Sequence, residues 1–281
     1  MPERYLNDAC VRALAALAVD AGRAIMAIYN EPGSWGVEMK TDDSPLTQAD
    51  LQANDIIVAG LAALASEIPV LSEESPWFGG QAATYWAVDP LDGTKEFLKR
   101  NGEFTVNIAL VIEGVARMGV ICAPALKVVW AGVSRDSTSQ MDAPWAARAQ
   151  LPALQPEALD TCSWERILVA ERDTQPLRMV GSRSHGTIHY PHWVSRHNIL
   201  TTPLERGSSL KFCLIAQGDA DLYVRMGPTS IWDTAAGHAI LSAAGGEVVH
   251  AETGDPLTYA EPGKALNPNF VAYGSSRFGP P

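Results

Sequence analysis

Residues 85–97 constrain the fold of this 281-residue chain more than any other stretch. The apolar run 85–88 is typical of a buried strand. Two acids follow it, Asp89 and Asp92, with a proline between them and Gly93 directly after. The proline keeps Asp89 out of helical backbone angles, whereas Gly93 allows a sharp turn or a close approach to a ligand. We therefore expect a strand that ends in two carboxylates and leads into a short helix.

The same stretch suits a metal and a phosphate together. Thr94 can cap the next turn, and the amides after it would offer an anion site. Mg²⁺ takes oxygen ligands such as Asp89 and Asp92, and it leaves coordination positions for substrate phosphate. An Asp-Gly pair is also common in plain hairpin turns. The acids found elsewhere in the chain favour the metal interpretation, because they supply the context that a short motif needs.

Charge and cysteine spacing limit the class of protein. The net charge of −11 disfavours nucleic acid as a partner, since duplex binding needs a basic face. A small polyanion can still bind where metal ions dominate the local field. The four cysteines lie far apart without metal-ligand or redox-motif spacing, which indicates buried thiols in a reducing compartment. With no signal peptide and no run able to span a bilayer, we expect a cytoplasmic protein. Peripheral contact with the inner face of a membrane and the oligomeric state stay open.

Hydrophobic spacing divides the chain into helices and strands. It predicts helices over 8–29 and from Thr47 to about residue 65, and paired strands over 103–113 and 114–122. A polar loop at 41–45 could act as a lid. The Ala-, Pro- and Gln-rich stretch 135–164 marks the expected boundary between two domains. These are an N-terminal α+β metal-binding domain over 1–155 and a C-terminal α/β nucleotide-side domain over 156–281, with the active site between them.

Further charged residues fall where strands end or helices begin. Asp50 lies three residues after Thr47, either as the acid of a capping box or as a group that orients a hydroxyl in the site. Glu73 and Glu74 follow the strand-like run 69–72. They could simply be solvated, or one of them could bind metal. Asp233 could cap a helix, as could Ser208 at the start of another. Lys211, in the first turn of the latter, opposes the helix dipole, which indicates either a nearby anion or a solvated lysine.

The local chemistry leads to phosphoryl hydrolysis and no further. Clustered acids without a cation repel one another, and no histidine or thiolate cluster favours zinc. His238 has no second histidine at metal spacing and is expected to be a packed helix residue. Two Mg²⁺ ions among such acids could clamp a phosphate and activate a water. The residues taken alone do not name a substrate.

Longer segments resemble a known family. Residues 73–75, 89–94 and 232–237 resemble the signatures of the inositol monophosphatase superfamily of lithium-sensitive, Mg²⁺-dependent phosphatases. Residues 95–110, 207–213 and 227–229 are similar to its bacterial 3′(2′),5′-bisphosphate nucleotidase branch. The resemblance runs from the first helix to the last strand and is weakest between about residues 135 and 175. It implies an α/β fold (α+β), layered as an α/β/α/β/α sandwich.

The resemblance also implies roles for individual residues. Two or three Mg²⁺ ions would be held by Glu73, Asp89, the Leu91 carbonyl, Asp92 and Asp233. Asp50 would orient the Thr94 hydroxyl, and Thr94 and Glu73 would position the attacking water. The implied substrate contacts are Glu73, Leu91, Asp92, Gly93, Thr94, His185, Gly207, Ser208, Lys211, Arg225 and Asp233.

The implied reaction is hydrolysis of the 3′-phosphate of adenosine 3′,5′-bisphosphate to AMP and phosphate in sulfate assimilation, with 3′-phosphoadenylylsulfate as a second substrate. A cation beside the 5′-phosphate would explain a preference for bisphosphates, since an unpaired buried charge is costly. An inositol monophosphatase or sugar bisphosphatase is the alternative enzyme, and the residues at 207–211 and at 225 argue against it. A catalytically silent nucleotide-binding module is the alternative from another class, and the intact carboxylate set counts against it.

Overall fold

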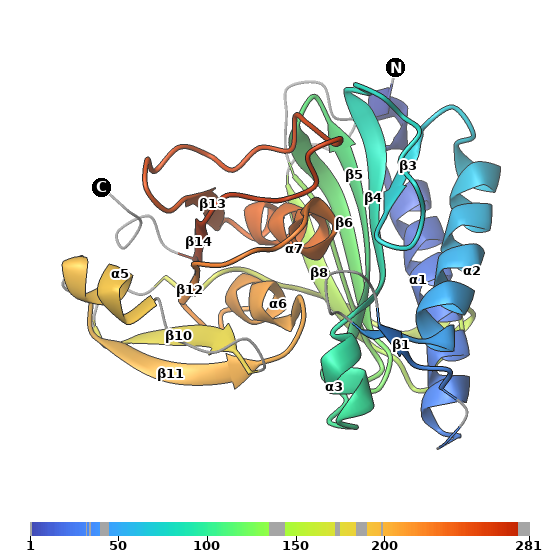
Figure 1. The fold of residues 1–281 in the computed structure, drawn as a ribbon, viewed down its shortest axis with the longest axis horizontal. Coiled ribbons are helices and arrows are strands. Elements are labelled where there is room, and N and C mark those ends of the chain that lie inside the picture. The colour runs from blue at the N-terminus through green and yellow to red at the C-terminus, as the bar shows by residue number, and fades with distance from the viewer. Residues whose placement is uncertain are drawn as a thin grey trace.

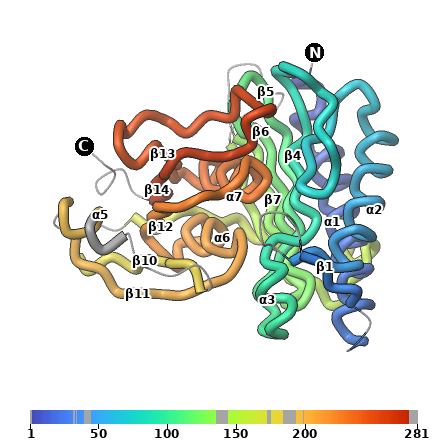
Figure 2. Tube along the Cα trace, in the orientation of Figure 1, coloured from blue at the N-terminus to red at the C-terminus, as the bar shows by residue number. Residues whose placement is uncertain are grey.

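The computed structural model describes residues 2–31, 33, 35–39, 45–134, 144–171, 175–183, 190–197 and 199–274. These residues form five layers in the order helix, sheet, helix, sheet, helix (Figure 1). The chain starts at the outer helix layer, builds the larger sheet, and then builds the smaller sheet (Figure 2). The layered α/β/α/β/α architecture implied by the sequence is confirmed. No helix within the described ranges is both long and apolar enough to cross a membrane.

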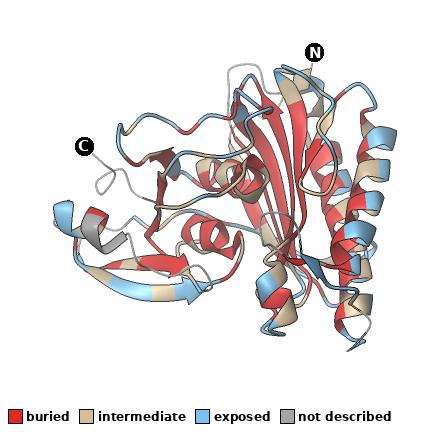
Figure 3. Ribbon diagram, viewed as in Figure 1, coloured by how far each residue is buried: buried red, intermediate tan, exposed pale blue. Residues whose placement is uncertain are grey.

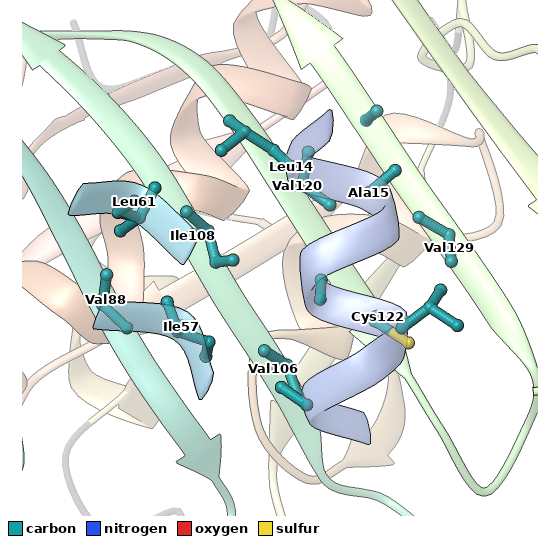
Figure 4. Packing of buried hydrophobic residues seen from close by; sticks show 14 of the residues in the cluster. Leu14, Ala15, Ile57, Leu61, Val88, Val106, Ile108, Val120, Cys122 and Val129 are labelled. Carbon is teal, nitrogen blue, oxygen red and sulfur yellow. The ribbon is translucent and has the colours of Figure 1, made fainter. Parts of the chain in front are cut away.

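The outer layer consists of α1 (Asp8–Tyr29) and α2 (Gln48–Leu64). Each helix buries one face against the larger sheet and exposes the other (Figure 3). Leu14 of α1 and Ile57 of α2 pack on sheet residues such as Val88 and Val120 (Figure 4). These side chains are all essentially inaccessible to water. Burying an aliphatic side chain contributes roughly 1.5–3 kcal/mol, so this contact fixes the face of α2 that carries Asp50.

The larger sheet has seven strands in sequence order, of which only β3 and β4 are parallel. The expected β5–β6 hairpin is confirmed, with Glu113 and Gly114 at its turn. Both turn residues have positive φ, as a tight hairpin turn requires. The strands are β3 (Val70–Ser72), β4 (Thr84–Asp92), β5 (Thr105–Ile112), β6 (Val115–Ala123), β7 (Val128–Val133), β8 (Trp145–Gln150) and β9 (Trp164–Arg166).

The middle layer consists of α6 (Leu210–Ala216) and α7 (Ile231–Ala243). Helix α7 contacts β4–β7 on one side and β13 on the other, so both sheets share it. Its approach to the larger sheet is very close, because a Cβ added at Gly119 would lie 2.3 Å from the Ala236 carbonyl oxygen. Glycine is thus needed at this point of β6.

The smaller sheet has the order β11-β10-β12-β14-β13, with parallel β11, β10 and β12 and antiparallel β14 and β13. Its strands are β10 (Leu177–Ser182), β11 (Thr201–Arg206), β12 (Leu222–Arg225), β13 (Glu247–His250) and β14 (Phe270–Tyr273). Helix α5 (Tyr190–Arg196) covers its outer face. The short elements are η1 (Pro2–Tyr5), β1 (Glu38–Met39), β2 (Pro45–Leu46), α3 (Thr94–Leu98) and α4 (Ala158–Thr161).

Three predicted helix caps are wrong. Helix α7 begins at Ile231 with Ser230 as its N-cap, so Asp233 is the third residue of the helix and completes a capping box. Helix α6 has Ser209 rather than Ser208 as its N-cap. Ser208 has φ +48°, a left-handed conformation that places it in the preceding turn. Helix α3 begins at Thr94 with Gly93 as its N-cap, so Thr94 is the first residue of that helix and not its cap.

Candidate active site

A bulge in β4 brings Asp89 and Asp92 to the same face of the sheet. Asp89 pairs with Asn107 of β5, and Asp92 pairs with Thr105. Three steps along β4 therefore match two along β5, so β4 carries one extra residue between the acids. Without it, side chains three residues apart would point to opposite faces. The extra residue follows from the proline, which has no N–H for the ladder, and from the Leu91 N–H, which donates to Asp89 Oδ1 (3.0 Å).

Three acids from separate elements meet beside this bulge. Carboxylate oxygens of Glu73, Asp89 and Asp233 all lie within 4.8 Å of one another. Glu73 directly follows β3, and its N–H donates to the Val88 carbonyl of β4 (3.2 Å). Asp233 Oδ2 accepts the Ser230 N–H (2.6 Å). Asp89 is buried, whereas Glu73 and Asp233 are half-buried. We call Glu73, Asp89 and Asp233 the acidic trio.

Burial and mutual repulsion perturb this trio. Burial raises the pKa of Asp89 well above its usual value, and the neighbouring charges of Glu73 and Asp92 raise it further. Burial, followed by the charge of Asp92, raises the pKa of Asp233 to about 7. Carboxylates under such repulsion are stabilised by a cation. A donor set made only of carboxylate oxygens fits a hard divalent ion such as Mg²⁺ and gives zinc no preferred ligand.

The metal-free protein is expected to lose stability as pH rises from about 4 to about 7. In this window Asp233 keeps a proton in the folded state, with a pKa of about 7, that it has lost in the unfolded state. The folded state then binds more protons, so the free energy of unfolding falls as pH rises. Mg²⁺ displaces these protons, and its stabilising effect should grow across the same window.

Thermal unfolding in EDTA and in Mg²⁺, at about pH 5 and about pH 7.5, measures this effect. The difference between wild type and Asp233→Asn isolates the contribution of that carboxyl group, because asparagine does not titrate. A Mg²⁺-induced shift in Tm of the same size at both pH values would contradict the expectation.

Asp50 fulfils both interpretations that the sequence left open. Its Oδ2 accepts the Thr47 N–H (2.7 Å) and the Thr47 hydroxyl (2.6 Å), which completes the capping box of α2. Its Oδ1 lies 3.3 Å from Thr94 Oγ1, which can donate to it or to the Leu91 carbonyl at the same distance. Asp50 is 2% exposed. It is thus a fixed acceptor directly behind the Thr94 hydroxyl.

The 207–209 loop packs against the turn that carries Gly93. Gly93 has φ +93°, and a Cβ added there would lie 3.3 Å from Ser208 Cβ. The Gly207 N–H donates to Glu103 Oε2 (2.8 Å), and Arg183 binds the same carboxylate through Nε (2.8 Å) and Nη2 (3.0 Å). The Ser208 hydroxyl is buried and has no hydrogen-bond partner among the described residues. The loop is therefore anchored by its backbone, and a polar side-chain atom is left for a ligand.

Lys211 is a buried cation beside the acids. It is 6% exposed, its Nζ donates to the Ser208 carbonyl, and it lies 5.3 Å from the ring centre of Tyr223. Burial lowers the pKa of Lys211 to about 8, while the charge of Asp92 opposes that shift. Arg225 is held at the end of β12 by the Pro228 carbonyl (2.6 Å). The solvated-lysine interpretation of Lys211 is wrong, because the side chain is inside the protein.

The structure brings together most of the residues predicted for the site. Thr94 contacts both Asp50 and Leu91. The members of the acidic trio lie together, and Asp92 contacts the start of α6. His185 and residues 41–44 of the expected lid lie outside the described residues. His238 Nδ1 lies 3.0 Å from the Tyr259 hydroxyl, which agrees with a packed helix residue. Glu103, Asn107 and Ser209 also belong to the site and were not predicted. A single asparagine inside the apolar strand 105–112 indicates that a buried hydrogen-bond partner must exist.

Known proteins are similar to this chain in sequence and in fold. The inositol monophosphatase family profile matches residues 7–274. The chain is 45% identical over 235 residues to the 3′(2′),5′-bisphosphate nucleotidase CysQ of Shigella flexneri, covering 82% of this chain and 85% of that protein. The protein of the same name from Escherichia coli (strain K12) is 44% identical over the same shares of both chains.

Solved structures agree with these matches. The crystal structure of CysQ from Bacteroides thetaiotaomicron, a bacterial member of the inositol monophosphatase family, superposes with a TM-score of 0.75 at 40% identity, covering 93% of this chain and 96% of that one. The inositol monophosphatase from Anabaena (Nostoc) sp. PCC 7120 has a TM-score of 0.70 at 23% identity, covering 95% and 91%. The second likeness concerns the fold alone.

Proposed function

The chain belongs to the inositol monophosphatase family, and we propose that it is a metal-dependent 3′(2′),5′-bisphosphate nucleotidase. It removes the 3′-phosphate of adenosine 3′,5′-bisphosphate and releases AMP and inorganic phosphate. The names of its relatives at 44–46% identity support this substrate class. The observation that carries the proposal is the buried cation Lys211, whose charged form is stabilised by the nearby carboxylates of Asp92 and Asp233.

Five groups of the chain would hold two or three metal ions. When bound, Mg²⁺ neutralises the carboxylates and polarises the phosphoryl group as a Lewis acid. The family is metal-dependent, and a donor set made only of oxygen atoms suits this ion. The ligands are Glu73, Asp89, the Leu91 carbonyl, Asp92 and Asp233.

Thr94 and Asp50 position the attacking water. The Thr94 hydroxyl has Asp50 Oδ1 as an acceptor, so its own oxygen can accept a hydrogen bond from water. As the water oxygen bonds to phosphorus, its proton passes by way of Thr94 to Asp50, and the bond from phosphorus to the 3′-oxygen breaks. The leaving 3′-oxygen takes a proton from solvent to become the 3′-hydroxyl of AMP, and Asp50 returns its proton to solvent. Glu73, a half-buried member of the trio that directly follows β3, orients the same water. The Gly93 and Thr94 amides bind phosphate oxygens. No covalent intermediate is needed, because positioning and electrostatics supply the catalysis.

The nucleotide lies on the side of the 207–211 segment. Lys211 and Arg225 supply positive charge for the second phosphate, Gly207 and Ser208 line the approach, and His185 is expected nearby. An inositol monophosphatase would use the same acids on a substrate with a single phosphate and has no need of both cations. 3′-Phosphoadenylylsulfate carries the same 3′-phosphate and is a proposed second substrate. The proposed role is to clear a by-product of sulfate assimilation.

Lys211→Met is expected to raise the KM for adenosine 3′,5′-bisphosphate by about 10- to 100-fold. A hydrogen bond to a charged group contributes roughly 1.5–3 kcal/mol, and each 1.36 kcal/mol is a factor of ten. Turnover of inositol 1-phosphate, which lacks the second phosphate, should change far less. Lys264→Met is the control, because the Lys264 side chain is 79% exposed and pairs only with Glu261 among the described residues. Equal losses on both substrates would contradict the assignment.

Phosphate release from adenosine 3′,5′-bisphosphate and from inositol 1-phosphate, side by side in Mg²⁺, tests the proposed function. We expect strong preference for the nucleotide and inhibition by Li⁺. Preference for the inositol phosphate would keep the chemistry and remove the nucleotide assignment. Binding of the nucleotide without turnover of either compound would instead indicate a silent binding module.

A further inference from the structure

Two buried groups that are not among the predicted site residues hold Asp92. The Ser209 hydroxyl lies 2.7 Å from Asp92 Oδ2, and Asn107 Nδ2 lies 3.2 Å from the same oxygen. Both hydrogen bonds that Asp92 accepts from described side chains therefore end on Oδ2. Ser209 and Asn107 are 2% and 1% exposed, so water does not compete for these contacts. The orientation of the Asp92 carboxylate is thus set from one side, and its other oxygen is left for a ligand.

The Ser209 hydroxyl does not make the hydrogen bond that a serine at a helix N-cap usually makes. Ser209 is the N-cap of α6, where a serine side chain normally accepts a backbone N–H of the first turn. No such bond forms here. The hydroxyl instead accepts from Asn107 Nδ2 (2.8 Å) and donates its single proton to Asp92 Oδ2 or to the Asp233 carbonyl (2.9 Å). It therefore joins the ends of β4, β5 and α7 at the site.

Asn107 completes the network. Because a carboxylate can only accept, the amide nitrogen of Asn107 must face Asp92. Its oxygen accepts the Thr105 hydroxyl (2.9 Å), which holds the amide in that orientation. Every polar side-chain atom of Thr105, Asn107 and Ser209 has a partner, and buried groups satisfied in this way are rigid. The apolar neighbours of Asn107 along β5 offer no other explanation for an amide at this point of the strand.

We propose that Ser209, supported by Asn107, is a positioning residue that holds Asp92 ready to bind a divalent cation. The inference rests on the proposed function for the role of Asp92 as a ligand. Outer partners of metal ligands typically change metal affinity by 10- to 100-fold when they are removed. Ser209→Ala should therefore weaken cation binding even though Ser209 itself is not a ligand.

The test is binding of Mn²⁺ to the full-length protein without substrate, followed by titration calorimetry or by the electron paramagnetic resonance of free Mn²⁺. We expect Ser209→Ala to raise the Kd for Mn²⁺ about 10- to 100-fold. The Mg²⁺ concentration for half-maximal rate should rise by a similar factor, while the KM for the nucleotide at saturating Mg²⁺ stays close to that of wild type. Thr105→Val, which removes only the support of Asn107, should cause a smaller change in the same direction.

Ser134→Ala is the matched control. Ser134 is also a buried serine, and its hydroxyl donates to backbone carbonyls at the edge of β6 rather than to a carboxylate. This variant should bind Mn²⁺ like wild type. Wild-type affinity in Ser209→Ala, or equal losses in Ser209→Ala and Ser134→Ala, would overturn the proposal. A wild-type protein that binds Mn²⁺ but does not hydrolyse the nucleotide would instead count against the proposed function alone.

Discussion

Asp89→Asn is expected to lower kcat by about three orders of magnitude and, at the same time, to stabilise the metal-free protein. Asp89 is the most buried member of the acidic trio, and the metal it would hold contributes several kcal/mol to catalysis. A loss of about 4 kcal/mol corresponds to a factor of about 10³. The gain in stability follows because burial and the charges of Glu73 and Asp92 already disfavour the ionised form and raise its pKa.

The rate of phosphate release and the Tm in EDTA measure the two effects. Asparagine keeps the shape and can still accept the Leu91 N–H, so a general loss of folding is not expected. Asp55→Asn is the control on the exposed face of α2, and it should change neither quantity. An Asp89→Asn variant with kcat within about tenfold of wild type would show that this carboxylate holds no catalytic metal.

Thr94→Val is expected to lower kcat by about 10²- to 10³-fold and to leave Mn²⁺ binding close to that of wild type. The valine has almost the same shape, and it removes only the hydroxyl that lies 3.3 Å from Asp50 Oδ1. Positioned proton-transfer groups contribute effects of this size. The Thr94 side chain is not among the expected metal ligands, so cation affinity should not follow kcat.

Thr94→Ser is the matched variant, since it restores the hydroxyl without the methyl group. It should recover most of the lost rate. If serine at this position were as slow as valine, the methyl group and its packing would be responsible, and the hydroxyl would have no part in positioning the water.

The sequence predicted the elements of the site better than their ends. The apolar run 85–88 and the Asp-Pro-Leu-Asp-Gly-Thr segment that follows it correctly placed Asp89 and Asp92 at the end of a strand. They did not reveal that β4 continues through the motif to Asp92 with an inserted residue. A bulge depends on which β5 residues face it, and that pairing is a tertiary contact. The same limit explains the caps of α6 and α7, because Ser208 and Ser209, or Ser230 and Asp233, are equally suitable caps by residue type.

The hydrogen-bond network that holds Asp92 could not be predicted from the spacing of residues in the sequence. Asn107 and Ser209 are about a hundred positions apart in the chain, and they meet only because α6 packs beside the larger sheet. Asn107 alone gave a signal, as a polar residue within an apolar strand. The domain division at residue 155 and the cytoplasmic location stay predictions. Strands β8 and β9 add the stretch 145–166 to the larger sheet.

The most direct test of the central claim is the identity of the products formed from adenosine 3′,5′-bisphosphate and Mg²⁺, separated by chromatography. Removal of the 3′-phosphate predicts AMP and inorganic phosphate in equal amounts. Adenosine 3′-phosphate as the main product would contradict the account, because the 5′-phosphate would then lie at the acidic trio. Unchanged nucleotide, from a protein that binds it and Mg²⁺, would mean that the assembled site does not catalyse the reaction.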